Sequence, residues 1–166
     1  MVLARFRSLG LTARVRSIAL VLSSLLWMAA SASCGRDVAT GSRFQVLGAA
    51  VVRDTATGLE WTRHDDGVGL DWFKAEAYCR SLSTDGGRGW RLPTIEELAG
   101  LHDARLRTPC GDTTCGIDPV FTLTSPYVWS ATAPGEGART YLDFQYGTRL
   151  SPSIRPILVR RVLCIR

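Results

Sequence analysis

The sequence predicts an α+β domain, and three observations lead to this fold class. Strand-like stretches flank a turn at residues 54–58, two helical patterns follow between residues 71 and 101, and three strand-like stretches close the chain. The length of 166 residues and the hydrophobic content of 46% fit one ordinary globular domain. We therefore expect two helices packed on small antiparallel sheets, with a long irregular loop region beside them.

The first 33 residues predict an export signal. Four arginines precede an apolar stretch from Ile18 to about Ala30, and small residues follow it up to Cys34. The apolar stretch is about thirteen residues long, whereas a membrane-spanning helix needs about twenty. Two cleavage positions compete. Cleavage after Ala32 would fit an ordinary signal peptidase, and the sequence Ser31-Ala32-Ser33-Cys34 resembles a lipobox, whose cysteine would be lipidated.

The cysteine count favours the lipoprotein interpretation. The chain has five cysteines, so that an even set remains for disulfides once Cys34 is set aside. An odd thiol in an oxidising compartment needs a separate role, and lipidation supplies one. We expect an exported protein in the cell envelope, attached by a lipid at Cys34 to the outer membrane, or otherwise periplasmic or secreted. Residues 34–48 would form a short tether, and residues 49–166 the folded domain.

The basic charge of the chain belongs to the export signal. The formal net charge is +5, and four of the twenty basic residues precede Cys34, where no acidic residue occurs. The remaining sixteen basic residues face fifteen acidic residues, so the expected domain is almost neutral. A basic surface of the kind that binds nucleic acid is not predicted, and we expect no nucleic-acid partner.

Local signals predict both helices. Asp71 can cap the first helix, whose apolar stripe is expected to be buried and which should end near residues 85–87. Thr94 and Glu97 have the spacing of a capping box at the start of the second helix. The apolar stripes at helical spacing are Trp72, Ala75, Cys79 and Leu82 in the first helix, and Ile95, Leu98 and Leu101 in the second.

Prolines and glycines make residues 104–126 largely irregular in this interpretation. Three strand-like stretches follow, at residues 127–132, 140–146 and 157–165. Four tryptophans fall on apolar stripes or strands and are expected in the core. They are Trp61, Trp72, Trp90 and Trp129.

An ordered set of motifs covers about residues 50–166. The motifs are Val52-x-Asp54-x-x-Thr57-Gly58-Leu59-x-Trp61, Trp72-x-x-Ala75-x-x-Tyr78-Cys79-x-x-Leu82, Trp90-Arg91-Leu92-Pro93-Thr94-x-x-Glu97-Leu98, Asp118-Pro119-x-Phe121, Trp129-Ser130-x-Thr132, Tyr141-x-Asp143-Phe144-x-x-Gly147 and Val162-x-Cys164-Ile165-Arg166. In this order they resemble the Lcl C-terminal domain of bacterial secreted proteins. Leu163 departs from the family, which often has arginine there, and the pair Cys110 and Cys115 is not a general family feature.

The resemblance implies a fold similar to C-type lectins and to the formylglycine-generating enzyme. It also implies a disulfide between Cys79 and Cys164, which with the even cysteine count leaves Cys110 to pair with Cys115. The namesake of the family is the glycan-binding tail of a collagen-like adhesin, and no general catalytic activity is attached to the family. A non-catalytic, adhesive or carbohydrate-binding domain is therefore the leading expectation.

Catalytic and metal chemistry find little support in the sequence. The candidate general bases are His64 and His102, and no G-x-S-x-G motif or paired nucleophile accompanies them. Three acids, Asp65, Asp66 and Asp71, could supply oxygen ligands to calcium, but acidic loop clusters are more often solvated. We expect no cofactor and no enzymatic activity.

The ligand-binding surface is predicted in the irregular region, because loops on a rigid scaffold often carry ligand contacts. Arginine forks favour carboxylate and sulfate groups, so an acidic glycan is the expected ligand. The alternatives are an enzyme on the formylglycine-generating-enzyme-like fold and a structural or accessory envelope protein. The candidate binding residues are Arg105, Arg107, Asp112, Arg139, Tyr141 and Asp143.

Overall fold

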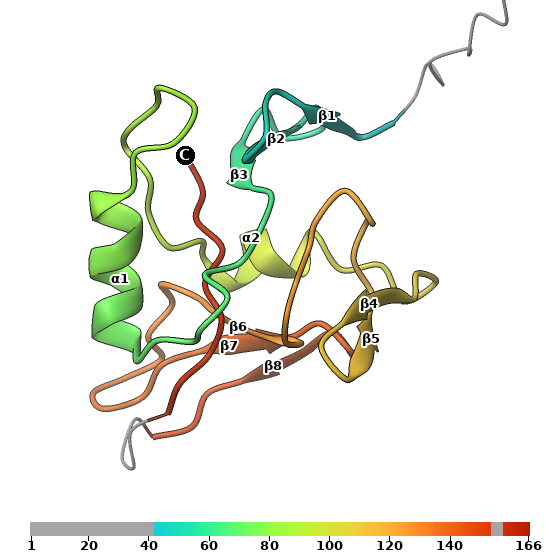
Figure 1. The fold of residues 1–166 in the computed structure, drawn as a ribbon. Helices are drawn as coiled ribbons and strands as arrows, with labels where there is room; N and C mark the ends of the chain where they lie inside the picture. The colour runs from blue at the N-terminus through green and yellow to red at the C-terminus, as the bar shows by residue number, and fades with distance from the viewer. Residues whose placement is uncertain (1–41, 154–157) are drawn as a thin grey trace, which may run out of the picture. The chain divides into compact units, whose positions relative to one another are not determined.

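The computed structural model of the chain describes residues 42–153 and 158–166 (Figure 1). The predicted export signal, the lipidation position Cys34 and the first part of the predicted tether lie outside these residues. In the part of the chain that is described, no helix combines the length and the apolar character that crossing a membrane requires.

The predicted fold class, a C-type-lectin-like α+β domain with two helices packed on small antiparallel sheets and a long irregular loop region, is wrong. The described residues form mostly small antiparallel sheets and only two short helices (Figure 1). The three sheets have the strand orders β1-β2-β3, β4-β5 and β6-β7-β8. The elements are β1 (Phe44–Val46), β2 (Val51–Asp54), β3 (Glu60–Thr62), α1 (Trp72–Ser81), α2 (Ile95–Ala99), β4 (Thr108–Cys110), β5 (Thr113–Cys115), β6 (Tyr127–Trp129), β7 (Tyr141–Asp143) and β8 (Thr148–Leu150).

Both helices start where the sequence predicts and are shorter than their apolar stripes. The Asp71 side chain accepts a hydrogen bond from the Lys74 amide at 3.0 Å and caps α1, which ends before the predicted stop at residues 85–87. Thr94 and Glu97 form the predicted capping box of α2. The helix has only five residues, and Leu101 keeps its buried position in a turn beyond it, where its amide donates to the Leu98 carbonyl. Apolar residues at helical spacing are therefore buried over a longer stretch than the helix itself covers.

The folded unit begins earlier than predicted. Residues 44–46, assigned to the tether, form β1, which pairs antiparallel with β2. Arg43 donates to both carboxylate oxygens of the buried Asp54, at 2.9 and 2.5 Å. Burial raises the pKa of Asp54, but hydrogen bonds from Arg43 and from the Ala56 amide outweigh burial and hold this pKa below its ordinary value. An ion pair thus fixes β1 to the sheet at neutral pH.

The region predicted to be irregular, residues 104–126, contains the hairpin of β4 and β5. Gly111 occupies the first turn position with a φ of +61°, a conformation that glycine adopts without steric cost. A Cβ at this position would also lie 2.6 Å from the Thr124 carbonyl oxygen. The disulfide Cys110–Cys115 joins the two strands, as predicted.

The end of the chain differs from its prediction in a way that matters for the site. β6 and β7 lie within the predicted strand stretches, and β8 was not predicted. The third predicted strand, residues 157–165, forms isolated bridges in its described part. We call residues 158–166 the C-terminal segment; it contacts both three-stranded sheets through backbone hydrogen bonds (Figure 1).

Two clusters of buried side chains form the core. One surrounds Trp61 and the other contains Trp72, Trp90 and Trp129, so the four predicted core tryptophans are buried. The predicted disulfide Cys79–Cys164 lies in the second cluster and joins α1 to the C-terminal segment. The position of the C-terminal segment is therefore fixed by covalent and hydrophobic contacts.

Candidate ligand-binding site

The predicted loop residues Arg105, Arg107 and Asp112 are exposed, and they line neither of the two pockets described below. Arg105 donates to the carboxylate of Asp103 at 3.0 and 2.7 Å, and these hydrogen bonds hold the pKa of Asp103 below its ordinary value. Arg107 donates to the carbonyl oxygens of Ala104 and of its neighbour in the same loop. Both guanidinium groups thus have local partners already.

The other three predicted binding residues, Arg139, Tyr141 and Asp143, are buried or partly covered by neighbouring side chains. Tyr141 exposes 7% and Asp143 exposes 6% of its surface, so each presents little area to a ligand, and their part in binding stays a prediction. Asp143 accepts the Gln145 amide at 2.8 Å. Arg139 lies over the Trp72 ring, 4.2 Å from its centroid. The structure therefore does not unite the six predicted residues at one site.

The histidines and acids considered for chemistry also have structural surroundings. His64 is exposed, whereas the His102 ring packs closely against Gly116 and Gly147. Among the described residues, no group of three or more His, Cys, Asp or Glu side chains lies in a position to hold a metal ion. The expected lack of a cofactor stays a prediction.

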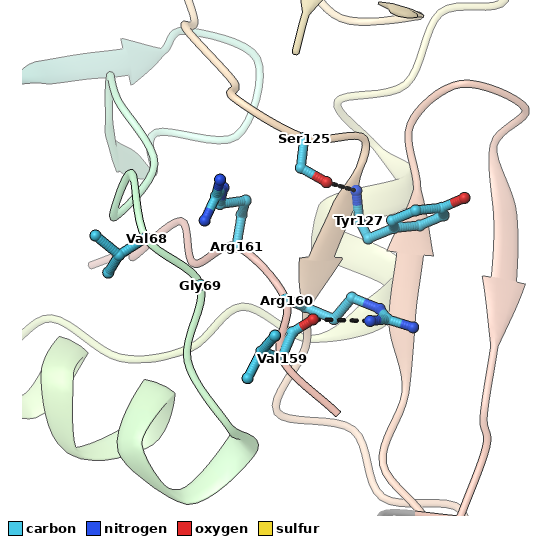
Figure 2. Close-up of a pocket in the computed structure, with 7 residues that line it drawn as sticks. All are labelled: Val68, Gly69, Ser125, Tyr127, Val159, Arg160 and Arg161. Carbon is cyan, nitrogen blue, oxygen red and sulfur yellow. Dashed lines mark hydrogen bonds between the residues drawn. The ribbon is translucent and has the colours of Figure 1, made fainter. Parts of the chain in front are cut away.

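Figure 2 shows a pocket that the sequence did not predict. Its volume is about 330 Å³, within the range of small-molecule sites. The C-terminal segment crosses it between the loop that follows β3 and the start of β6. We call it the arginine pocket, and it is lined by Val68, Gly69, Ser125, Tyr127, Val159, Arg160 and Arg161.

Backbone hydrogen bonds place the two arginines. Arg160 exchanges two backbone hydrogen bonds with Leu70, at 2.9 and 3.1 Å. The Arg161 amide donates to the Tyr127 carbonyl, and its carbonyl accepts from the Trp129 amide. Arg160 thus bonds the C-terminal segment to the loop that follows β3, and Arg161 bonds it to β6. As adjacent residues of an extended chain do, the two side chains leave in opposite directions (Figure 2).

The Arg160 guanidinium lies against two aromatic rings. It is 4.5 Å from the Tyr141 ring centroid and 5.1 Å from that of Tyr127, distances at which a cation is attracted by the ring. It donates to the Val159 carbonyl at 2.7 Å, and its Nε is buried without a hydrogen-bond partner. No described carboxylate lies within ion-pair distance of Arg160. Its positive charge is therefore not neutralised by any described carboxylate.

Arg161 has one distant carboxylate. Its Nε lies 3.8 Å from Oδ2 of Asp65, which is too long for a hydrogen bond, and this Nε is also buried without a hydrogen-bond partner. The Asp65 carboxylate instead accepts from the Thr124 amide at 2.6 Å and from the Thr124 hydroxyl at 3.0 Å. The charge of Arg161 is therefore only partly balanced.

Asp66 joins the loop to the C-terminal segment. One carboxylate oxygen accepts from the Gly69 amide at 2.7 Å and the other from the Val162 amide at 2.9 Å. Burial raises the pKa of the nearby Tyr78 phenol, and the charges of Asp66 and Asp65 raise it further. Asp65 and Asp66, two of the acids considered as calcium ligands, thus accept hydrogen bonds from backbone amides and hold together the segments around the arginine pocket.

A second pocket, of about 440 Å³, lies beside α1 and the start of α2, and its arginines are fully paired. Arg80 lies 2.6 Å from Glu76, and Arg91 donates to both carboxylate oxygens of Glu97 at 2.8 and 2.7 Å. These short ion pairs leave little attraction for an added anion. The arginine pocket differs because its two cations lack such pairs.

The chemistry that the arginine pocket offers is recognition of an anion. Two guanidinium groups present planar donor sets that match carboxylate and sulfate oxygens. The Tyr127 ring and the Ser125 hydroxyl add an apolar face and a polar group. The sequence did contain a signal for this site, since Arg160 and Arg161 interrupt an otherwise apolar stretch at residues 157–165.

Comparison with protein families supports the resemblance seen in the sequence. A family model described as the Lcl C-terminal domain matches residues 50–163. No curated protein matches the chain. Because the family match covers more than half of the sequence and includes both walls of the arginine pocket, the chain belongs to the Lcl C-terminal domain family.

Proposed function

We propose that this domain is a non-catalytic binding module of the cell envelope that holds an acidic glycan at the arginine pocket. The observation that carries the proposal is the pair of cations in the arginine pocket. Arg160 lies against two tyrosine rings with no described carboxylate in ion-pair distance, and the Nε of Arg161 is 3.8 Å from Asp65. Placing a cation in this way costs free energy unless a partner satisfies it. A carboxylate or sulfate group of a glycan would supply that partner and would fit the arginine fork.

A glycan array with the purified protein tests the proposal. We expect saturable retention on glycans that carry carboxylate or sulfate groups, and weaker retention as the salt concentration rises, because ions screen partly exposed charges. Neutral glycans of the same backbone serve as the control. Retention on the neutral glycans alone, or chemical conversion of the bound glycan, would contradict a binding module for acidic ligands.

We propose further that the protein is exported and anchored in the envelope by a lipid at Cys34. The structure supports this proposal indirectly, because it joins the other four cysteines to one another in two disulfides. Stable membrane attachment takes more than one acyl chain, as a lipoprotein anchor provides.

Metabolic labelling with a palmitate analogue checks the anchor. The wild-type protein should carry the label, and the Cys34→Ala variant should lose it and leave the membrane fraction. The anchor is ruled out if the wild type remains unlabelled or if the variant keeps the label.

A further inference from the structure

We infer that the arginine pocket takes one carboxylated sugar residue that bears a short acyl or alkyl substituent, such as an N-acetylated sugar acid. This inference rests on the proposed function and narrows its ligand class. It starts from exposed apolar side chains, which are costly to leave in water and often mark binding sites. Three of the seven exposed large hydrophobic side chains among residues 42–153 and 158–166 line the arginine pocket: Val68 (75%), Val159 (55%) and Tyr127 (36%).

Gly69 brings charge and apolar surface together within the pocket. A Cβ at Gly69 would lie 3.1 Å from Nη1 of Arg161 and 3.8 Å from Cβ of Val159. Gly69, which has no side chain, therefore lies close to both the guanidinium group and the valine side chain. Gly69 also has a φ of +81°, which disfavours other residues at this position. A ligand in this corner meets a cation and methyl groups at the same time.

This juxtaposition favours a ligand that carries a carboxylate and a small apolar group on one sugar residue. The carboxylate would accept hydrogen bonds from Arg161, and an acetyl or similar methyl would contact Val159 and Val68. A ligand that has only charge, such as a sulfated or uronic sugar, would leave both valines in water. A neutral N-acetylated sugar would leave the arginines without an anion.

The other side of the pocket accommodates a sugar ring. Tyr127 is partly exposed, and its ring can pack against the apolar face of a pyranose. The Arg160 guanidinium beside it can donate to ring hydroxyls or to a second acceptor of the ligand. A volume of about 330 Å³ is at the lower end of the range for ligand sites, which suits one substituted sugar residue.

Calorimetric titration of the purified protein with three sugars tests the inference. N-acetylneuraminic acid has both features, glucuronic acid has the carboxylate alone, and N-acetylglucosamine has the acetyl group alone. We expect N-acetylneuraminic acid to bind at least about fourfold more tightly than glucuronic acid, since each buried methyl group adds roughly that factor. N-acetylglucosamine should bind more weakly than both acids.

Two variants test whether Val68 and Val159 cause the preference for N-acetylneuraminic acid over glucuronic acid. In the Val68→Thr/Val159→Thr variant each side chain keeps its shape but exchanges a methyl group for a hydroxyl. Its affinity for N-acetylneuraminic acid should fall severalfold. Its affinity for glucuronic acid should stay the same, so that the two affinities become similar. Both valines are exposed, so the fold should be unaffected. Val46→Thr is the matched control, because Val46 is exposed on β1 and is not among the residues that line the pocket.

The outcomes separate this inference from the proposed function. Equal affinity of the wild type for both sugar acids, or an unchanged preference in the double threonine variant, overturns the inference and leaves the acidic-glycan proposal standing. If neither sugar acid binds and the array shows no retention on any acidic glycan, the proposed function and the inference both fail.

Discussion

Replacing Cys79 and Cys164 together by alanine should lower the free energy of unfolding by about 4.6 kcal/mol, the largest stability effect that we expect. The two cysteines are 85 residues apart in the sequence, so the disulfide removes much of the chain entropy of the unfolded state. Both are fully buried in the cluster that surrounds Trp129, and the loss of packing there adds to the cost. Urea unfolding followed by tryptophan fluorescence measures the change.

The second disulfide provides the control. Cys110 and Cys115 are only 5 residues apart, and loop entropy gives this bridge about 2 kcal/mol. The Cys110→Ala/Cys115→Ala variant should therefore lose about half as much stability as the first variant. A larger loss in the hairpin variant than in the Cys79→Ala/Cys164→Ala variant would show that the C-terminal segment is not held chiefly by the long-range bridge.

Neutralising Arg160 and Arg161 together should reduce retention on acidic glycans by about a hundredfold or more. Each hydrogen bond between a guanidinium and an anion contributes about 1.5 to 3 kcal/mol, and the Arg160→Gln/Arg161→Gln variant removes both charges. The melting temperature should fall moderately, because the variant loses the contacts of Arg160 with two tyrosine rings. It also leaves the buried Asp65 side chain without Arg161, so retention is measured well below the unfolding temperature. Retention is measured on the array and by titration, and thermal unfolding is followed in parallel.

The loop that the sequence analysis predicted as the binding surface provides the matched control. The Arg105→Gln/Arg107→Gln variant removes the same number of charges from residues that are exposed in the structure. Its retention should stay close to that of the wild type. If this loop variant loses retention while the Arg160→Gln/Arg161→Gln variant keeps it, the ligand contacts the loop and the arginine pocket is not the site.

Features that depend on neighbouring residues were predictable from the sequence. The Asp71 cap of α1 and the capping box of Thr94 and Glu97 each involve side chains within one helical turn, and both are confirmed. The turn after β2 follows from Asp54 and Gly58 in the same way. The resemblance to the family supplied the long-range disulfide, which local spacing alone could not pair.

The balance of helix and sheet was not predictable, and neither was the position of the site. Apolar residues at helical spacing indicate burial, and Leu101 satisfies the spacing outside α2. The walls of the arginine pocket are joined by contacts such as Asp66 with Val162, which are 96 residues apart. No local pattern encodes such a pair. The paired arginines were visible in the sequence, but the bridges that join their segment to the other walls of the pocket appear only in the structure.

Nitrogen-15 NMR of the arginine Nε–H groups during titration with an acidic sugar tests the central claim most directly. The Nε atoms of Arg160 and Arg161 are buried, so their protons should be shielded from water and give observable signals. When an anion binds to these guanidinium groups, both Nε signals should shift in a saturable manner. The signal of Arg139, whose Nε is buried beside Trp72, should stay in place as an internal reference. Saturable binding that leaves the Arg160 and Arg161 signals unmoved would contradict the assignment of the ligand to this pocket.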